Sequence, residues 1–136
     1  MSKLILIGIL FCLVFTGPLA VFGEVQPGNP RIDIPKETWN FGKVKEGKIL
    51  KHNFIIKNVG STELELNAFP SCRTCISPEL SQNNIPPKGK ADLYITLYTT
   101  GKSGKIEAYA MIQSNDPKQP VKKITVKAFV IGKPVK

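Results

Sequence analysis

The sequence has few of the side chains on which catalysis and metal binding usually depend. Its 136 residues include a single histidine, His52, and only three cysteines. A closed zinc site needs four ligands, and this set is too small and too dispersed to supply them. No nucleophile, base and orienting carboxylate are brought together by their spacing either. We therefore predict that the protein is not an enzyme and has no cofactor, and that His52 is a structural, hydrogen-bonded residue of a strand.

Aromatic residues are also scarce, at 8% of the chain, although 19 Lys and Arg against 10 Asp and Glu give a net charge of +9. Nucleic acid is a common partner for such a charge, but the scattered aromatic residues offer no platform on which bases could stack. We expect no nucleic acid partner. An envelope protein or an anionic polymer is the expected partner, and salt would screen the attraction. Solvated strand faces rich in lysine are the more ordinary explanation of the charge.

The first 23 residues have the composition of a secretory signal peptide. Lys3 precedes an apolar run from Leu4 to Phe15, and Gly17-Pro18 ends the run before a site with small residues. We expect a signal-peptide helix that is cleaved after Gly23 or after Ala20. An uncleaved membrane anchor is the competing interpretation, but Gly17-Pro18 interrupts the apolar run. The prediction is a periplasmic or secreted bacterial protein, with no membrane span after cleavage.

Beyond this segment, apolar and polar residues alternate with a period of two, which is typical of strands with one buried face. The clearest run extends from Leu50 to Lys57, and an edge strand is expected at 31–34. Trp39 and Phe41 share a strand face and are expected to close one end of the core. The other residues expected to face the core are Leu50, His52, Phe54, Ile56, Leu64, Leu66, Ala68, Leu93, Ile95, Leu97, Ile106, Ala108, Ala110, Ile112, Ile124, Val126, Ala128 and Val130.

Turn residues separate these runs. Residues 101–104 (Gly-Lys-Ser-Gly) superficially resemble a phosphate-binding loop, but Thr96 stands where that motif needs glycine, so nucleotide binding is excluded. We expect a hairpin turn there instead. Residues 114–117 (Ser-Asn-Asp-Pro) are a second strong turn signal. Pro86 and Pro87 prevent residues 83–89 from continuing a central strand.

About seven short strands at this spacing, with no amphipathic helix between them, predict an all-β protein. The favoured fold is an immunoglobulin-like antiparallel β-sandwich, and a small barrel is the alternative. The expected organisation is a signal peptide at 1–23, an extended leader at 24–30, the sandwich at 31–131 and a basic tail at 132–136.

Reactive side chains cluster only between Phe69 and Pro78, which we expect to be a loop. Because Cys12 lies within the N-terminal apolar run, Cys72 and Cys75 are left as a pair. In an oxidising compartment the first prediction is a structural disulfide between them, and a two-residue spacer permits its geometry. Thiol exchange and soft-metal binding, for instance of Cu(I) by two thiolates, are the alternatives. The residues that bind a partner remain unknown.

Four fragments together resemble a known family. They are residues 40–44 (Asn-Phe-Gly-Lys-Val), 52–60 (His-Asn-Phe-Ile-Ile-Lys-Asn-Val-Gly), 99–104 (Thr-Thr-Gly-Lys-Ser-Gly) and 114–117 (Ser-Asn-Asp-Pro). In this order they resemble a bacterial exported family of unknown function, domain of unknown function 1573, whose domain is similar to the Hydin-like immunoglobulin-type domains. The resemblance implies a sandwich of seven or eight strands, export and no established activity.

One departure from the family falls at the cysteines. Family members typically read Pro-Ser-Cys-Gly-Cys-Thr, whereas this chain has Arg73 and Thr74 between Cys72 and Cys75. The function predicted from all these features is an exported, non-catalytic module of the bacterial cell envelope that binds a protein or polymer. The alternative is a soft-metal-binding or thiol-redox protein acting through Cys72 and Cys75.

Overall fold

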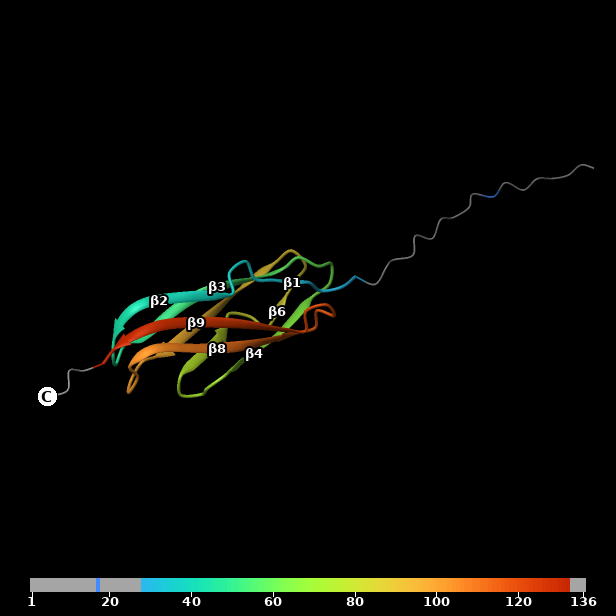
Figure 1. The fold of residues 1–136 in the computed structure, drawn as a ribbon. Coiled ribbons are helices and arrows are strands. Elements are labelled where there is room, and N and C mark those ends of the chain that lie inside the picture. Colours follow the sequence, from blue (N-terminus) through green and yellow to red (C-terminus); the bar gives the residue numbers. More distant parts are fainter. Residues whose placement is uncertain (1–16, 18–27, 133–136) are drawn as a thin grey trace, which may run out of the picture.

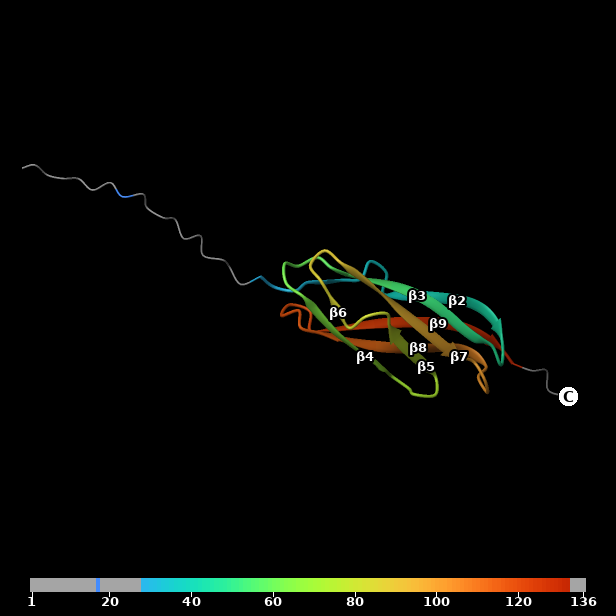
Figure 2. The same ribbon diagram turned by 180° about the vertical axis from the view of Figure 1, so that it is seen from behind.

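A computed structural model describes Gly17 and residues 28–132 of the chain. Within these residues the protein is a two-layer β-sandwich, with one sheet facing the viewer in Figure 1 and the other in Figure 2. A four-stranded sheet has the order β1-β3-β7-β5, and a five-stranded sheet has the order β2-β9-β8-β4-β6. The strands are β1 (Ile32–Asp33), β2 (Thr38–Lys45), β3 (Ile49–Asn58), β4 (Leu64–Pro70), β5 (Ile76–Leu80), β6 (Asn84–Ile85), β7 (Lys90–Tyr98), β8 (Gly104–Ser114) and β9 (Val121–Ile131). The predicted sandwich is confirmed.

The core lies between the two sheets and consists mainly of the predicted inward-facing residues. Further core residues, which were not among those predicted, are Ile32, Ile34, Ile76, Ile85 and Ala91. Phe54 and Leu93 of the four-stranded sheet, and Leu66 and Ile112 of the five-stranded sheet, are all at most 2% exposed. Trp39 and Phe41 pack against this core while remaining partly exposed, as expected. Full burial of a large apolar side chain contributes about 1.5–3 kcal/mol, so this double layer of Ile, Leu and Val is the main source of stability.

Most connections cross from one sheet to the other, which the spacing of the strands did not reveal. The turn at 101–104 does not close a hairpin, because β7 belongs to the four-stranded sheet and β8 to the five-stranded sheet. That prediction was wrong, because glycine and polar residues specify a reversal of the chain but not the sheet that the next strand joins. The pairing is antiparallel except between β2 and β9, which run parallel.

Strand β5 begins within the stretch expected to be loop, and the short strand β6 lies in 83–89, at an edge of its sheet and not in a central position. The cysteine loop is therefore narrower than predicted: Phe69 and Pro70 end β4, and Ile76 begins β5. Pro78 is tolerated in β5 because that strand forms an edge of its sheet. A strand of five residues that contains proline gives little periodic signal, which explains the miss.

Three buried polar residues tie the turns to the sandwich: Asn58, Thr99 and Asp116. The amide of Asn58 accepts hydrogen bonds from the backbone N–H groups of Arg31 and Gly60, and donates to the carbonyls of Thr62 and Ile85. All its polar atoms are thus satisfied, as burial requires. Thr99 donates its hydroxyl to the Lys48 carbonyl at 2.7 Å and joins two loops at one end of the molecule.

Across the described residues, no helix is long and apolar enough to cross a membrane. The predicted signal peptide apart from Gly17, most of the predicted leader, and the predicted tail beyond Gly132 lie outside the described residues.

Candidate functional site

A bulge in β2 opens the outer face of the five-stranded sheet. The register between β2 and β9 shifts between Asn40 and Lys43. Gly42 has a φ of 75°, and its N–H donates to the Asn40 side-chain oxygen at 2.8 Å. Positive φ is readily available to glycine, and a short polar side chain can close such a turn. The Asn-Phe-Gly fragment singled out from the sequence is therefore a local bend that separates β2 from its neighbour.

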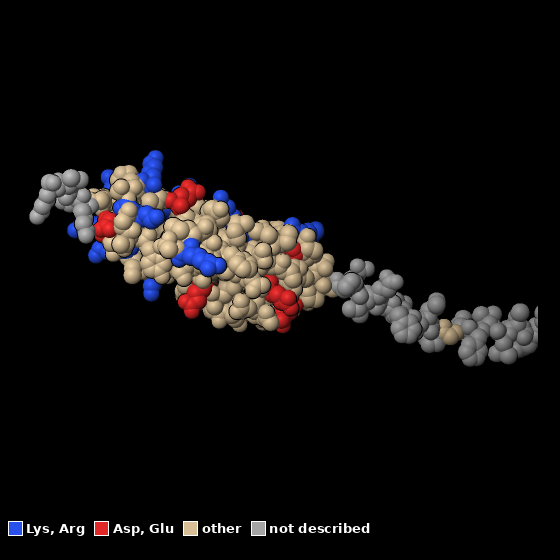
Figure 3. Space-filling model, turned by 90° about the horizontal axis from the view of Figure 1, so that it is seen from below, with Lys and Arg blue, Asp and Glu red and all other residues tan. Residues whose placement is uncertain are grey.

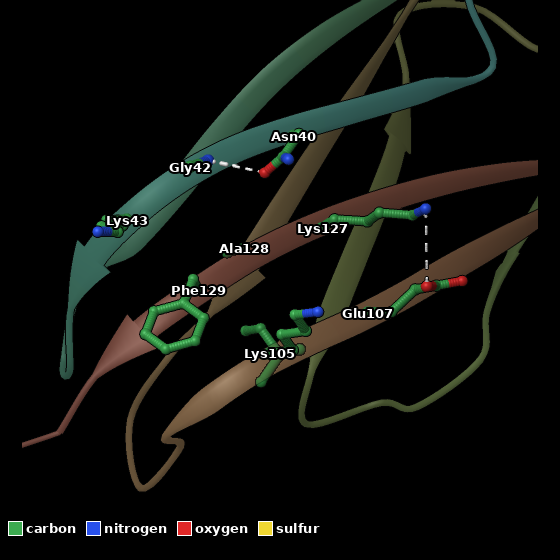
Figure 4. Close-up of a pocket in the computed structure, with 9 residues that line it drawn as sticks. Asn40, Gly42, Lys43, Lys105, Glu107, Lys127, Ala128 and Phe129 are labelled. Carbon is green, nitrogen blue, oxygen red and sulfur yellow. Dashed lines mark hydrogen bonds and ion pairs between the residues drawn. The ribbon is translucent and has the colours of Figure 1, made fainter.

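The bend borders an open hollow of about 780 Å³ on the outside of β2, β9 and β8. Figure 4 shows the Phe129 ring of β9 between Lys43 of β2 and Lys105 of β8. The residues that line the hollow are Asn40, Gly42, Lys43, Lys105, Ile106, Glu107, Lys127, Ala128 and Phe129. Phe129 is 42% exposed, which is a large apolar area to leave in contact with water.

Positive charge dominates the hollow. Three lysines line it, Lys43, Lys105 and Lys127, against one carboxylate, Glu107. Glu107 lies 4.0 Å from the Lys127 ammonium, and both side chains are exposed, so this ion pair is weak. The hollow is therefore suited to an anionic ligand. Figure 3 shows other basic side chains gathered toward the same end of the molecule, where β2 and β9 finish.

Two more aromatic residues continue the outer face away from the hollow. Tyr109 of β8 lies under the Lys123 ammonium, 4.5 Å from the ring centre, and Phe69 of β4 pairs with Met111 of β8. Phe69 is 47% exposed and Tyr109 is 37% exposed. We call this surface the basic-aromatic face; its residues are Lys43, Phe69, Lys105, Tyr109, Lys123, Lys127 and Phe129.

The cysteine loop lies at the junction of β4 and β5. The sulfurs of Cys72 and Cys75 are at disulfide distance, 2.09 Å, and their Cα atoms are 5.2 Å apart. The Cys72 carbonyl accepts hydrogen bonds from the N–H groups of Cys75 and Ile76, so the loop is a tight turn. Such a bridge is typical of an oxidising compartment.

A lysine and a hydroxyl group lie close to the pair. The Lys102 ammonium lies 3.9 Å from the Cys75 sulfur, and the Thr74 hydroxyl lies 3.3 Å from the Cys72 sulfur. No group of three or more potential ligands among His, Cys, Asp and Glu occurs within residues 28–132. The pair thus offers two sulfur atoms and a nearby positive charge.

His52 lies against aromatic rings and not in a reactive cluster. It stacks on Trp39 with the ring centres 3.8 Å apart, and it meets the edges of Phe41 and Phe54. Burial, followed by the charge of Lys36, holds the pKa of His52 below its usual value. His52 is thus packed by ring stacking, whereas its sequence position predicts a hydrogen-bonded residue.

The sequence of this sandwich matches a defined family. The model for a protein of unknown function, DUF1573, matches residues 32–130, which is most of the chain. The chain belongs to this family. No curated protein matches the sequence. Because the DUF1573 family is one of unknown function, membership assigns no activity to the chain.

Solved structures resemble the DUF1573 domain in fold. A protein of unknown function from Porphyromonas gingivalis is 24% identical with a TM-score of 0.65, over 74% of this chain and 46% of that one. This chain thus spans less than half the length of that protein. The ASH/PapD-like domain 7 of human CEP192 is 11% identical with a TM-score of 0.59, over 78% and 89% of the two chains. The Vibrio cholerae VesB protease is 9% identical with a TM-score of 0.56, over 75% and 31%. At these identities the likeness concerns the sandwich alone.

The basic-aromatic face of the DUF1573 domain was not predicted, although the sequence contains a signal for it. Phe69, Tyr109 and Phe129 each stand at a polar position of an alternating strand, on the face shared with Glu65, Glu107 and Lys127. An aromatic residue in the polar register of a strand must lie outside. That three such positions converge on one face depends on the sheet order β9-β8-β4, which the spacing could not provide.

Proposed function

We propose that the protein is a non-catalytic binding module of the bacterial cell envelope, and that its basic-aromatic face binds an acidic polysaccharide. The observation that carries this proposal is the exposed Phe129 ring between Lys43 and Lys105 in the hollow beside the β2 bulge. This arrangement combines an apolar platform with a predominantly positive charge.

The lysines favour an anionic ligand of extended shape. Lys105, Lys127 and Lys123 follow the outer faces of adjacent strands, so their ammonium groups can meet charges repeated along a polymer. Each exposed contact contributes little, because water and salt screen it. Several together give a binding that weakens steeply as salt rises.

The aromatic residues favour sugar rings over charge alone. The C–H face of a pyranose ring is apolar and can pack flat against an exposed aromatic side chain. Phe129 and Tyr109 offer such surfaces, and aromatic contacts supply large contact areas with little loss of side-chain freedom. A polymer that carries both sugar rings and carboxylates can use both kinds of contact.

Export and the absence of catalysis belong to the same proposal. Export is supported by the signal-peptide composition of residues 1–23 and by the sulfur pair at Cys72 and Cys75. In the periplasm or outside the cell, acidic glycans are accessible to such a module. The basic charge of the chain, +9, favours the same class of ligand.

Titration of the purified protein with three probe polymers tests the proposal. Polygalacturonate carries sugar rings and carboxylates, polyphosphate carries charge without sugar rings, and dextran carries sugar rings without charge. We expect the tightest binding to polygalacturonate, weaker binding to polyphosphate and no binding to dextran. Equal affinity for polygalacturonate and polyphosphate would contradict a role for the aromatic rings, and indifference to all three polymers would overturn the proposal.

A second candidate function rests on the Lys102 ammonium, 3.9 Å from the Cys75 sulfur. In a reduced protein a nearby cation favours the thiolate, which is the form that exchanges disulfides or binds Cu(I). Thiol titration with and without reductant, followed by competition for Cu(I), tests this candidate. A pair that resists mild reductant and does not compete for Cu(I) leaves only a structural role.

A further inference from the structure

Strand β3 has an unpaired edge over much of its length. On one side it pairs with β7 continuously from Ile49 to Lys57. On the other side it pairs with β1 only through Lys57 and Asn58. After Asp33 the chain meets Pro35, which has no N–H, and continues into β2 of the other sheet. For residues 49–56, therefore, no strand of the described chain occupies this side of β3.

The main-chain groups along this edge point outward in a known order. The N–H of Val59 donates to the Arg31 carbonyl on the β1 side, whereas the N–H of Asn58 donates to the Gly89 carbonyl on the β7 side. Along an antiparallel strand, the N–H and C=O groups of successive residues point alternately to one side of the strand and to the other. The N–H and C=O groups of Lys51, Asn53 and Ile55 thus face the open edge. Such a row of groups is a template for another strand.

An apolar floor and a basic rim border this edge. A hollow of about 370 Å³ lies beside it, lined by Pro35, Lys36, Trp39, His52, Asn53, Phe54, Ile55 and Lys57. The stacked rings of Trp39 and His52 form its floor, and Ile55 is 44% exposed at its rim. Lys36 and Lys57 supply the positive charge, while Asp92 bonds to the Asn53 amide nearby.

Strand β1 shows which side chains fit this edge. Ile32 and Ile34 point inward and are buried, whereas Asp33 between them stands opposite Lys57 on the outer face. A strand that continued the register of β1 along β3 would place inward residues opposite Phe54 and His52, beside Trp39. Its outward residues would lie opposite Ile55, Asn53 and Lys51. Apolar residues therefore suit the inward positions, and an acidic residue suits the position opposite Lys51.

We propose that the open edge of β3 binds an extended acidic segment of a partner protein as an added strand. Main-chain hydrogen bonds to Lys51, Asn53 and Ile55 would provide affinity, and the hollow at Trp39 with the flanking lysines would select the sequence. A second copy of this chain fits less well, because Lys51 and Lys57 of two such edges would face one another. This inference is independent of polysaccharide binding, since it concerns the other sheet.

Amide hydrogen exchange measured by NMR tests the inference on the full mature chain. In the free protein we expect fast exchange of the backbone amides of Lys51, Asn53 and Ile55. We expect slow exchange of the backbone amides of His52, Phe54 and Ile56, because these N–H groups donate toward β7. A synthetic peptide of alternating valine and aspartate should protect the first three amides, and one of alternating valine and lysine should not. Protection of those amides without peptide, or binding without their protection, would overturn the inference.

Two variants make the test specific. Ile55→Pro removes an edge N–H without touching the bonds to β7, and should abolish peptide binding, while Ile55→Ala keeps the N–H and should retain most of it. Should Ile55→Pro fail to fold, the double variant Lys36→Glu with Lys51→Glu decides, since neither lysine pairs with β1. Reversing both charges is expected to weaken the aspartate peptide about tenfold and to favour the lysine peptide. Unchanged preference in that variant would contradict the proposed edge.

Discussion

The Asp116 carboxylate accepts a hydrogen bond from the backbone N–H of Ile32 at 2.9 Å, across 84 positions of sequence. Its other oxygen accepts from the N–H groups of Lys118 and Gln119 within the turn between β8 and β9. The turn recognised in the sequence at 114–117 is therefore also the anchor of β1. Because β1 leaves most of β3 open, this anchor decides where the open edge begins.

Replacing Asp116 by alanine should destabilise the fold. The side chain is buried, and its removal leaves the N–H of Ile32 and those of the turn without acceptors, at a cost of about 1–3 kcal/mol. Urea unfolding followed by tryptophan fluorescence measures this loss. Glu63→Ala removes an exposed carboxylate and is the control, with a change within about 0.5 kcal/mol. Equal losses in the two variants would show that the anchor contributes nothing.

Acid should weaken the protein in part through His52. Burial, and then Lys36, lowers the pKa of His52 in the folded state, so the folded state prefers the neutral ring. This contribution is complete above the unfolded pKa of about 6.5 and is lost as the pH falls through the lower, folded value. The difference in unfolding free energy between pH 7 and pH 5 should shrink in His52→Phe, which keeps the ring stack. An unaltered difference would contradict the assignment.

The alternating apolar positions predicted the core because every second side chain of a strand lies on the same face, and the apolar face is the buried one. Phe54, Leu66, Leu93 and Ile112 were assigned inward from period alone, and the structure buries all four. The sheet that each strand joins depends on contacts between distant residues, such as Thr38 of β2 with Thr125 of β9. The parallel pair, the crossing at 101–104 and the basic-aromatic face all follow from this order and could not be read from local pattern.

Gly60→Ala should be among the more damaging small substitutions. A Cβ at this position would lie 2.2 Å from the Asn29 carbonyl oxygen and 2.5 Å from the Arg31 nitrogen, which are backbone atoms. The leading segment would have to move, with a loss of about 1–3 kcal/mol. Val59→Ala, at an exposed neighbouring position, is the control and should change little. Thermal unfolding of both variants measures the effect, and equal midpoints would refute the close approach.

Removing the sulfur pair should lower stability moderately without unfolding the protein. A bridge between Cys72 and Cys75 closes only a short loop, and the chain-entropy gain is limited to about 2 kcal/mol. Cys72→Ser with Cys75→Ser should fold, and reductant should lower the stability of the native protein to that of the variant. If reductant instead unfolded the native protein, the pair would hold the fold together, contrary to expectation.

The central claim is that the outer face of the five-stranded sheet binds acidic glycans, and a comparison of two aromatic substitutions tests it most directly. Phe129 lies on that face, whereas Tyr94, 45% exposed, lies on the outer face of the opposite sheet. The affinity of each variant for polygalacturonate is measured by calorimetric titration. We predict that Phe129→Ala weakens binding about tenfold while Tyr94→Ala leaves it unchanged. Equal affinity in the two variants, or a loss confined to Tyr94→Ala, would contradict the claim.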